Sequence, residues 1–317
     1  MDPLIYMRME NDSLDVKDFE LGEYSGKESF RLRTFDLGDG SNLSLPCGVI
    51  SREEGPTVCI VGGQHGIEWN GTYISQKIFK QIDKKKVTGN LVVLPILNPL
   101  AFNQKSRVSS IDSIDLNRTY LSKNYRKPTE RLGKLLFENI FSKMDYVVDV
   151  HTGGPGEYLP HAAVTNRKRI SEASLILPYI YVAKNWGNTL VSSSESQGIR
   201  SILLEIGRGR NINYEYVDKT IDGLKNYLKA TKLLKGSIDK RDEDVFVNKE
   251  KIGSPFSGFF KSNVELGEYI EEGEVIGIVE KILGKKEEIY SPISGRILYL
   301  RRERAVAEGE SIVHIFW

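Results

Sequence analysis

Short apolar runs alternate with segments of helical periodicity between residues 57 and 236, and this alternation constrains the fold more than any other feature of the chain. The runs at 57–61, 91–97, 146–150 and 201–206 have the length of buried strands, whereas the segments 69–82, 130–144 and 214–235 carry apolar residues at helical spacing. Alternating strands and helices are typical of an α/β layer fold. We therefore predict an α/β domain over residues 1–240, with a sheet flanked by helices.

Residues 245–317 have a different sequence pattern, with short apolar stretches between glycine-rich turns and an internal repeat. The segment SPFSG at 254–258 recurs as SPISG at 291–295, and EGE at 272–274 recurs at 308–310. These features predict a small all-β domain built from two similar halves. The pattern resembles the biotinyl/lipoyl barrel-sandwich fold, but no methionine flanks Lys281, Lys285 or Lys286 as it does in a carrier lysine motif.

Charged residues make up 27% of the chain and nearly cancel at a formal net charge of +1, which disfavours nucleic acid or an anionic membrane as a partner. We therefore expect a small-molecule partner. The apolar runs are far shorter than the roughly 20 residues that cross a bilayer, and the MDP start lacks a signal-peptide pattern, so we expect a cytoplasmic protein. Cys47 and Cys59 are too few for a disulfide scaffold and are expected to be buried thiols.

A histidine and a glutamate lie three residues apart in the segment GQHGIE at 63–68, directly after the first predicted strand. On a helical turn this spacing points His65 and Glu68 the same way, and both residue types bind zinc. A catalytic zinc takes three protein ligands and keeps one open position. Among the four histidines, His151 is placed like His65, at the end of a predicted strand and close to glycines. A buried core histidine is the alternative for either residue alone, but the pair favours a metal site.

Four motifs in the order found here resemble the succinylglutamate desuccinylase/aspartoacylase family, relatives of the zinc carboxypeptidases. They are GQHGIE at 63–68, DLNR at 115–118, DVH at 149–151 and LEIG at 204–207. The resemblance covers roughly residues 55–236 and implies a mixed sheet of the zinc carboxypeptidase type with an appended β domain. It also implies a set of site residues: His65, Glu68 and His151 as zinc ligands, Glu205 as general base, Arg107 as the oxyanion-stabilising arginine, and Asn117 with Arg118 as a clamp on a substrate carboxylate.

The chemistry of zinc supports these implied roles, because the metal lowers the pKa of bound water from 15.7 to about 7. Glu205 is suited to accept the proton of this water and to pass it to a leaving amine. Arg107 has the alternative of being a solvated surface arginine. Asp149 shares a strand face with His151, so that it either orients this histidine or makes a structural hydrogen bond. His161 is either a structural histidine or a substrate contact.

Three functions remain open at this point. The first is zinc-dependent hydrolysis of a small amide, such as an N-acyl amino acid, to a carboxylate and a free amine. The second is a zinc carboxypeptidase with the same ligands and clamp. The third is a non-catalytic binding module on the same fold, against which the combination of ligands, base and clamp argues. We expect the first, with a substrate that carries a carboxylate.

Overall fold

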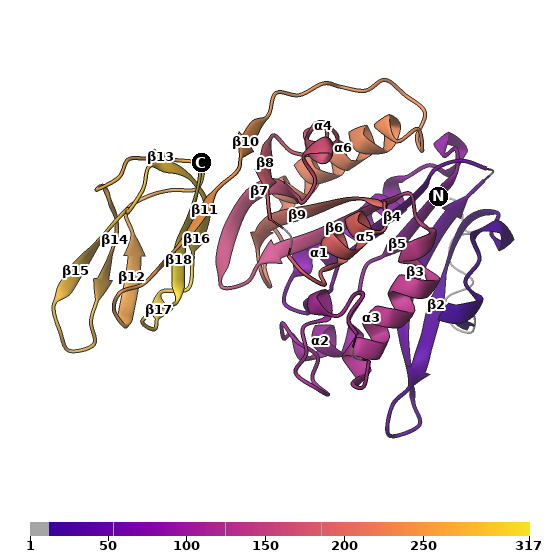
Figure 1. Cartoon of the computed structure of the whole chain (residues 1–317), viewed down its shortest axis with the longest axis horizontal. Coiled ribbons are helices and arrows are strands. Elements are labelled where there is room, and N and C mark those ends of the chain that lie inside the picture. Colours follow the sequence, from indigo (N-terminus) through magenta and orange to yellow (C-terminus); the bar gives the residue numbers. More distant parts are fainter. Residues whose placement is uncertain (1–12, 53, 124, 185) are drawn as a thin grey trace.

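The computed structural model describes residues 13–52, 54–123, 125–184 and 186–317. The MDP start, on which the expectation about a signal peptide rests, lies outside these residues. The described residues build one 14-stranded mixed sheet and one 4-stranded antiparallel sheet (Figure 1). The strands of the large sheet are β1 (Ser13–Asp15), β2 (Gly26–Asp36), β3 (Asn42–Ser51), β4 (Thr57–Val61), β5 (Asn90–Leu94), β6 (Tyr146–Gly153), β7 (Gly156–Val164), β8 (Tyr179–Val182), β9 (Arg200–Arg208), β10 (Asp244–Phe246), β11 (Lys249–Gly253), β13 (Tyr269–Ile270), β16 (Gly295–Arg301) and β18 (Ser311–Phe316).

The main path of this sheet runs in the order β1-β2-β3-β5-β4-β6-β9-β7-β16-β18-β11. Its centre is parallel, because β4 pairs in parallel with both β5 and β6, and β6 pairs in parallel with β9. The outer pairs, such as β2 with β3 and β9 with β7, are antiparallel. The carboxyl ends of β4, β6 and β9 therefore meet at one edge of the sheet, where open α/β sheets bind their ligands.

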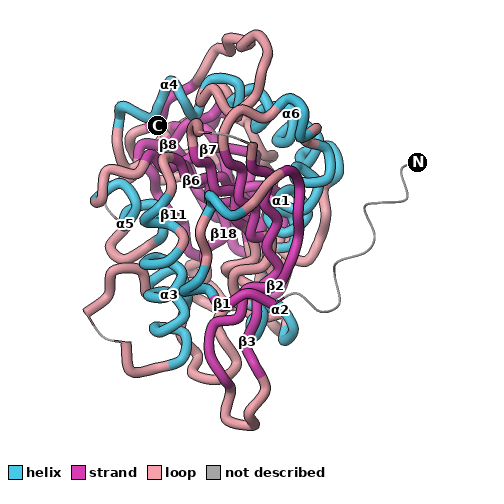
Figure 2. The backbone as a smooth tube through the Cα atoms, turned by 90° about the vertical axis from the view of Figure 1, so that its right-hand side faces the viewer, coloured by secondary structure: helices cyan, strands magenta, loops and turns pink. Residues whose placement is uncertain are grey.

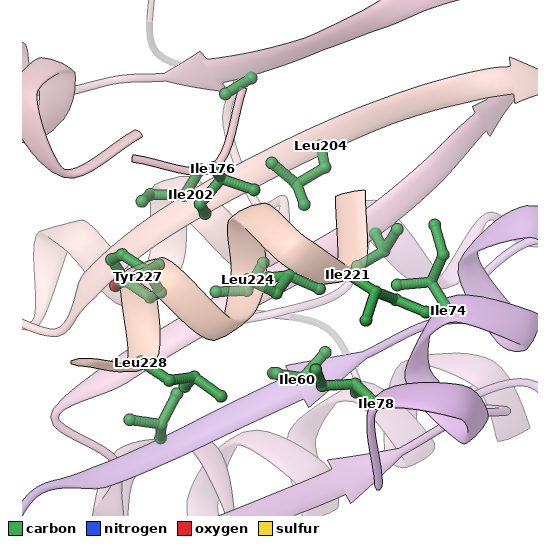
Figure 3. Close-up of a cluster of buried hydrophobic side chains, with 14 of the residues drawn as sticks. Ile60, Ile74, Ile78, Ile176, Ile202, Leu204, Ile221, Leu224, Tyr227 and Leu228 are labelled. Atoms are coloured by element: carbon green, nitrogen blue, oxygen red, sulfur yellow. The ribbon is translucent and has the colours of Figure 1, made fainter. Parts of the chain in front are cut away.

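Helices cover both faces of the central strands. They are α1 (Trp69–Gln81), α2 (Pro99–Gln104), α3 (Pro128–Asn139), α4 (Ile170–Ala173), α5 (Leu190–Ser196) and α6 (Tyr214–Ala230). Figure 2 shows α3 and α5 on one side of the strands and α1 and α6 on the other. The α1 and α6 side holds a cluster of buried aliphatic residues, including Ile60, Ile74, Leu204 and Leu224 (Figure 3). Each such side chain contributes about 1.5–3 kcal/mol on burial, so this layer fixes the sheet against α1 and α6.

The C-terminal part adds the small sheet of β12 (Gly258–Ser262), β14 (Val275–Glu280), β15 (Lys286–Tyr290) and β17 (Ala305–Val306). The two predicted repeats contact each other reciprocally through their backbones. Ser254 N donates to Glu310 O at 2.8 Å, and in the other half Ser291 N donates to Glu274 O at the same distance. Each serine hydroxyl also donates to the carbonyl two residues further on, at 2.6 Å. The two halves are therefore equivalent in contacts as well as in sequence.

The C-terminal part also extends the large sheet, because β16 pairs with β7 and β10 pairs with β8. The fold has the predicted composition of a mixed sheet flanked by helices and a C-terminal antiparallel β part. Cys47 and Cys59 are buried free thiols, as expected. In the described part of the chain, no helix combines the length and the apolar character that crossing a membrane requires.

Candidate active site

The loop after β4 brings His65 and Glu68 together. It is tightly packed, since a Cβ on Gly66 would lie 1.9 Å from the Ala101 carbonyl oxygen, so only glycine fits there. Glu68 is the residue that precedes the first turn of α1. His65 Nδ1 lies 2.6 Å from Glu68 Oε1, and both side chains are buried. The spacing of three residues thus points the two side chains at each other.

His151 reaches the same carboxylate from β6, the strand next to β4. Its Nδ1 lies 2.8 Å from Glu68 Oε2, and the Thr152 backbone N–H donates to the same oxygen at 3.1 Å. One donor atom of each of His65, Glu68 and His151 lies within 4.8 Å of the others. Two imidazole nitrogens and a carboxylate are a donor set that suits zinc.

A carboxylate stands behind each of the two imidazoles. Asp115 Oδ1 lies 2.9 Å from His65 Nε2, and Asp149 Oδ2 lies 3.0 Å from His151 Nε2. When Nε2 donates to such a carboxylate, the Nδ1 lone pair is left to face Glu68, which is the arrangement typical of metal-binding histidines. The alternative in which Asp149 orients His151 therefore agrees with its contact, while the same role for Asp115 was not predicted.

Two further residues that were not predicted support Asp149. Gln64 Nε2 donates to Asp149 Oδ2 at 2.6 Å, and the buried Tyr120 hydroxyl donates to Gln64 Oε1 at 2.9 Å. Asn117 also contacts His151, with its Nδ2 3.1 Å from Nε2, while its Oδ1 accepts from the Leu190 backbone N–H at 2.8 Å. Both ends of the Asn117 amide thus contact other groups of the protein. The one sequence signal for Gln64 is its position directly before His65.

The charges of this cluster oppose the effect of burial. Burial alone would lower the pKa of His65, but Glu68 and Asp115 raise it. Likewise, Asp149 and Glu68 raise the pKa of His151 well above its usual value. Burial would raise the pKa of Glu68, but the two histidines hold it below the usual range. Three carboxylates around two imidazoles make this centre attractive to a divalent cation.

The two predicted arginines lie in different surroundings. Arg107 NH2 donates to Asp115 Oδ2 at 3.0 Å, and its NH1 lies 3.7 Å from Glu68 Oε1, so this guanidinium borders the histidine cluster. Arg118 is exposed, and its NH1 donates to the Asn117 carbonyl oxygen at 2.6 Å. Of the two, Arg107 is the one in direct contact with the candidate metal-binding residues.

Glu205 lies on β9 between two histidines, opposite His151 of β6 and opposite His161 of β7. Burial raises the pKa of Glu205 to about 7, against the lowering effect of the His151 charge. Its Oε2 atom is buried and has no hydrogen-bond partner among the residues that the structure describes. His161 Nδ1 donates to the Leu159 carbonyl oxygen at 2.9 Å, and burial lowers the pKa of His161 to about 3, so it stays neutral. A carboxyl group that titrates near neutrality beside a candidate metal centre suits acid and base chemistry.

Comparisons with known proteins agree with this geometry. The chain is 27% identical over 253 residues to an N-alpha-acetyl-L-2,4-diaminobutyric acid deacetylase from Halomonas elongata, which covers 75% of this chain and 74% of that protein. The fold matches a product-bound structure of the ectoine utilization protein EutE (DoeB) from Ruegeria pomeroyi, with a TM-score of 0.86, 21% identity and coverage of 94% and 97% of the two chains. It also matches a succinylglutamate desuccinylase/aspartoacylase from Rhodobacter sphaeroides, with a TM-score of 0.85, 21% identity and coverage of 94% and 98%.

A sequence profile of the succinylglutamate desuccinylase/aspartoacylase catalytic domain matches residues 54–231, more than half of the chain. This range contains the glycine-flanked His65 loop, the DLNR segment, His151 and Glu205. The chain therefore belongs to the succinylglutamate desuccinylase/aspartoacylase family.

Proposed function

We propose that this protein is a zinc-dependent amidohydrolase that cleaves an N-acyl amino acid or a similar small amide into a carboxylate and a free amine. The observation that carries the proposal is the convergence of His65 Nδ1 and His151 Nδ1 on the Glu68 carboxylate, beside the partly buried Glu205. The 27% identical deacetylase supports the reaction class.

The residues of the centre fit a zinc ion. His65, Glu68 and His151 would hold it, and Asp115 and Asp149 would keep the two imidazoles in the orientation that presents Nδ1. When bound, zinc acidifies a water molecule and polarises the substrate carbonyl. Three protein ligands leave a position open for this chemistry.

Glu205 would carry the proton. Its unpartnered Oε2 atom accepts a proton from the attacking water and later gives it to the nitrogen of the leaving amine. A pKa raised to about 7 suits both steps, because the group gains and loses a proton near neutrality. The Arg107 guanidinium, 3.7 Å from Glu68, would offset the negative charge that develops on the carbonyl oxygen.

The proposed substrate carries a carboxylate, and Arg118 with Asn117 is the proposed clamp for it. The exposed guanidinium of Arg118 offers the planar fork that carboxylates bind. Asn117 would then contribute mainly by packing against His151, since its Nδ2 lies 3.1 Å from His151 Nε2 and its Oδ1 already accepts from the Leu190 backbone N–H.

The experiment that tests the function combines metal analysis with a substrate screen. We expect about one zinc per purified chain, loss of hydrolysis on chelation, and return of hydrolysis when zinc is added. His65→Ala and His151→Ala should strongly reduce the metal content. His161→Ala should retain it, because this buried histidine lies on β7, which is separated from β6 by β9.

The substrate screen compares N-acyl amino acids, among them N-alpha-acetyl-L-2,4-diaminobutyrate, with dipeptides, and detects the free amine. Full metal occupancy in both ligand variants would contradict the site. Hydrolysis of dipeptides alone would favour a carboxypeptidase over the proposed deacylase.

A further inference from the structure

Asn70, the second residue of α1, is fully buried and makes three side-chain hydrogen bonds to backbone atoms outside its own helix. Its Nδ2 donates to the carbonyl oxygens of Arg208, at 3.0 Å, and of Asn211, at 2.9 Å. Its Oδ1 accepts from the backbone N–H of Asn213 at 2.9 Å. Arg208 ends β9 and Asn213 precedes α6, so this one side chain is bonded at both ends and in the middle of the segment 209–213, which we call the β9–α6 loop.

The β9–α6 loop lies between the two segments that carry the candidate metal ligands. The Gly209 N–H donates to the carbonyl oxygen of Gly153, the last residue of β6. The Arg210 N–H donates to the carbonyl oxygen of Ile67, in the segment between β4 and α1, at 2.7 Å. A Cβ on Gly209 would lie 3.0 Å from both of these carbonyl oxygens. The loop therefore touches both segments with its backbone and can keep them at a fixed separation.

The conformation of the β9–α6 loop needs support from its surroundings. Arg210 has a φ of 52°, in the left-handed region that residues with a side chain rarely adopt. Such a backbone persists only where neighbouring groups hold it. Asn70 bonds the chain on both sides of Arg210, at the Arg208 and Asn211 carbonyl oxygens. Without the Asn70 amide, these carbonyl groups would lose their donor and the loop could relax away from the two segments that it separates.

We propose that Asn70 is a positioning residue, which holds the β9–α6 loop in place and thereby fixes Glu205 and the candidate zinc ligands relative to one another. Its three hydrogen bonds go to backbone atoms, so it acts through the loop and not on the substrate. The effect on turnover rests on the proposed function. A small displacement of reacting groups lowers a rate steeply, which makes a residue outside the reacting set important for catalysis.

The test compares Asn70→Ala with Asn226→Ala in the full-length, zinc-loaded protein. Asn226 is a matched control, because it is also a buried helical asparagine that bonds a loop backbone through three hydrogen bonds. Its Nδ2 donates to the carbonyl oxygens of Leu175, at 3.3 Å, and of Asp239, at 2.7 Å, while its Oδ1 accepts from the Asp239 N–H at 2.8 Å. At 1.5 Å per residue, it lies about 20 Å along α6 from the β9–α6 loop.

Both variants should lose stability to urea, but Asn70→Ala alone should impair the site. With the N-acyl amino acid that the parent protein hydrolyses fastest, Asn70→Ala should lower kcat by about tenfold or more and change KM less. Its zinc affinity, measured by competition with a chelator, should fall by about tenfold or more, as when a residue that orients metal ligands is removed. Asn226→Ala should keep kcat and zinc affinity. If Asn70→Ala does not fold, Asn70→Ser, which keeps a shorter polar group, is measured in the same way.

Amide hydrogen exchange of the zinc-free proteins tests the same role without a substrate. Peptides that contain Gly209 and Arg210 should exchange about tenfold faster in Asn70→Ala than in Asn226→Ala, because the loop opens more often. Equal exchange in the two variants, or equal kcat and zinc affinity, would overturn the assignment. If the parent protein hydrolyses none of the N-acyl amino acids, the proposed function fails, whereas hydrogen exchange still decides whether Asn70 holds the loop.

Discussion

At the scale of single residues, the candidate centre is organised by carboxylates that hold other side chains. Glu68 joins the two histidines, while Asp115 and Asp149 contact their outer nitrogens. Glu205 differs from these three, since burial raises its pKa to about 7. Its Oε2 has no partner among the described residues; the same is true of Asp149 Oδ1, but the other oxygen of Asp149 contacts His151. The first three carboxylates are engaged with other side chains, and Glu205 is the one that remains available for proton transfer.

Glu205→Gln should therefore retain zinc and the native fold but lower kcat by at least ~100-fold, because an amide cannot accept the proton. In the parent protein, kcat/KM should fall as the pH drops below about 7, since Glu205 must be deprotonated to act as a base. The residual activity of the Gln variant should not show this fall of kcat/KM at low pH. The pH dependence of kcat/KM, measured for both proteins, decides this. The same decrease below about pH 7 in the Gln variant would mean that another group titrates there.

His65, Glu68 and His151 could be predicted because the signal is local: a short spacing, glycine neighbours and the end of a strand. The contributions of Gln64, Tyr120 and Asp115 to the site could not be predicted. Their contacts join segments that lie more than 40 residues apart, such as Tyr120 and Gln64. Such a contact cannot be predicted from amphipathic periodicity or from composition.

At the scale of elements, the close packing of α1 on β6 sets the distance between the candidate ligands. Glu68 precedes the first turn of α1, and His151 lies on β6 directly after Val150. A Cβ on Gly71 of α1 would lie 2.2 Å from the Val150 carbonyl oxygen. Glycine at this position allows the helix backbone to approach the strand, and so allows Glu68 to reach His151.

Gly71→Ala should push α1 away from β6, destabilise the protein by about 1–3 kcal/mol and weaken metal binding. Gly22→Ala is the control, because a Cβ there meets no atom within 4 Å and its site is remote from α1 in sequence. Urea unfolding and zinc titration measure the two effects. Parent-like stability and zinc affinity in the Gly71 variant would show that the helix can shift without cost.

The sequence predicted the central strands better than the outer ones. The apolar run 57–61 coincides with β4, because a strand buried on both faces is apolar throughout. The hairpin of β2 and β3 was not predicted, since β2 is only partly buried and mixes polar with apolar residues. The predicted helix 130–144 ends earlier, at Asn139, and a 3₁₀ turn at Phe141–Lys143 follows it.

At the scale of the whole molecule, the large sheet crosses the proposed boundary between residues 1–240 and 245–317. β16 pairs with β7, and β10 pairs with β8, so backbone hydrogen bonds join the two parts. Aromatic rings reinforce this junction, with Tyr158 of β7 and Tyr299 of β16 at a centroid distance of 4.9 Å. Two parts that share a sheet and a core layer are expected to unfold together.

The three tryptophans allow this expectation to be measured. Trp69 opens α1, and Trp317 follows β18 at the far end of the sheet, where its backbone bonds Asn248. Variants that keep only one of these two tryptophans, with phenylalanine at the other positions, report on the two parts separately. We expect coincident unfolding midpoints in urea. Well-separated midpoints would mean that the two parts are independent domains.

The shared sheet has a consequence for the newly made chain as it leaves the ribosome. β7 is complete at Val164, but its partner β16 begins at Gly295, roughly 130 residues later. β7 can pair early with β9, but its segment 156–158, which β16 covers later, stays open on the order of ten seconds at ~5–20 residues per second. An open strand edge invites pairing with other chains, and a proline without an N–H is one natural protection against it. Pro160 lies within β7, so that this strand offers one donor fewer to a wrong neighbour while it waits.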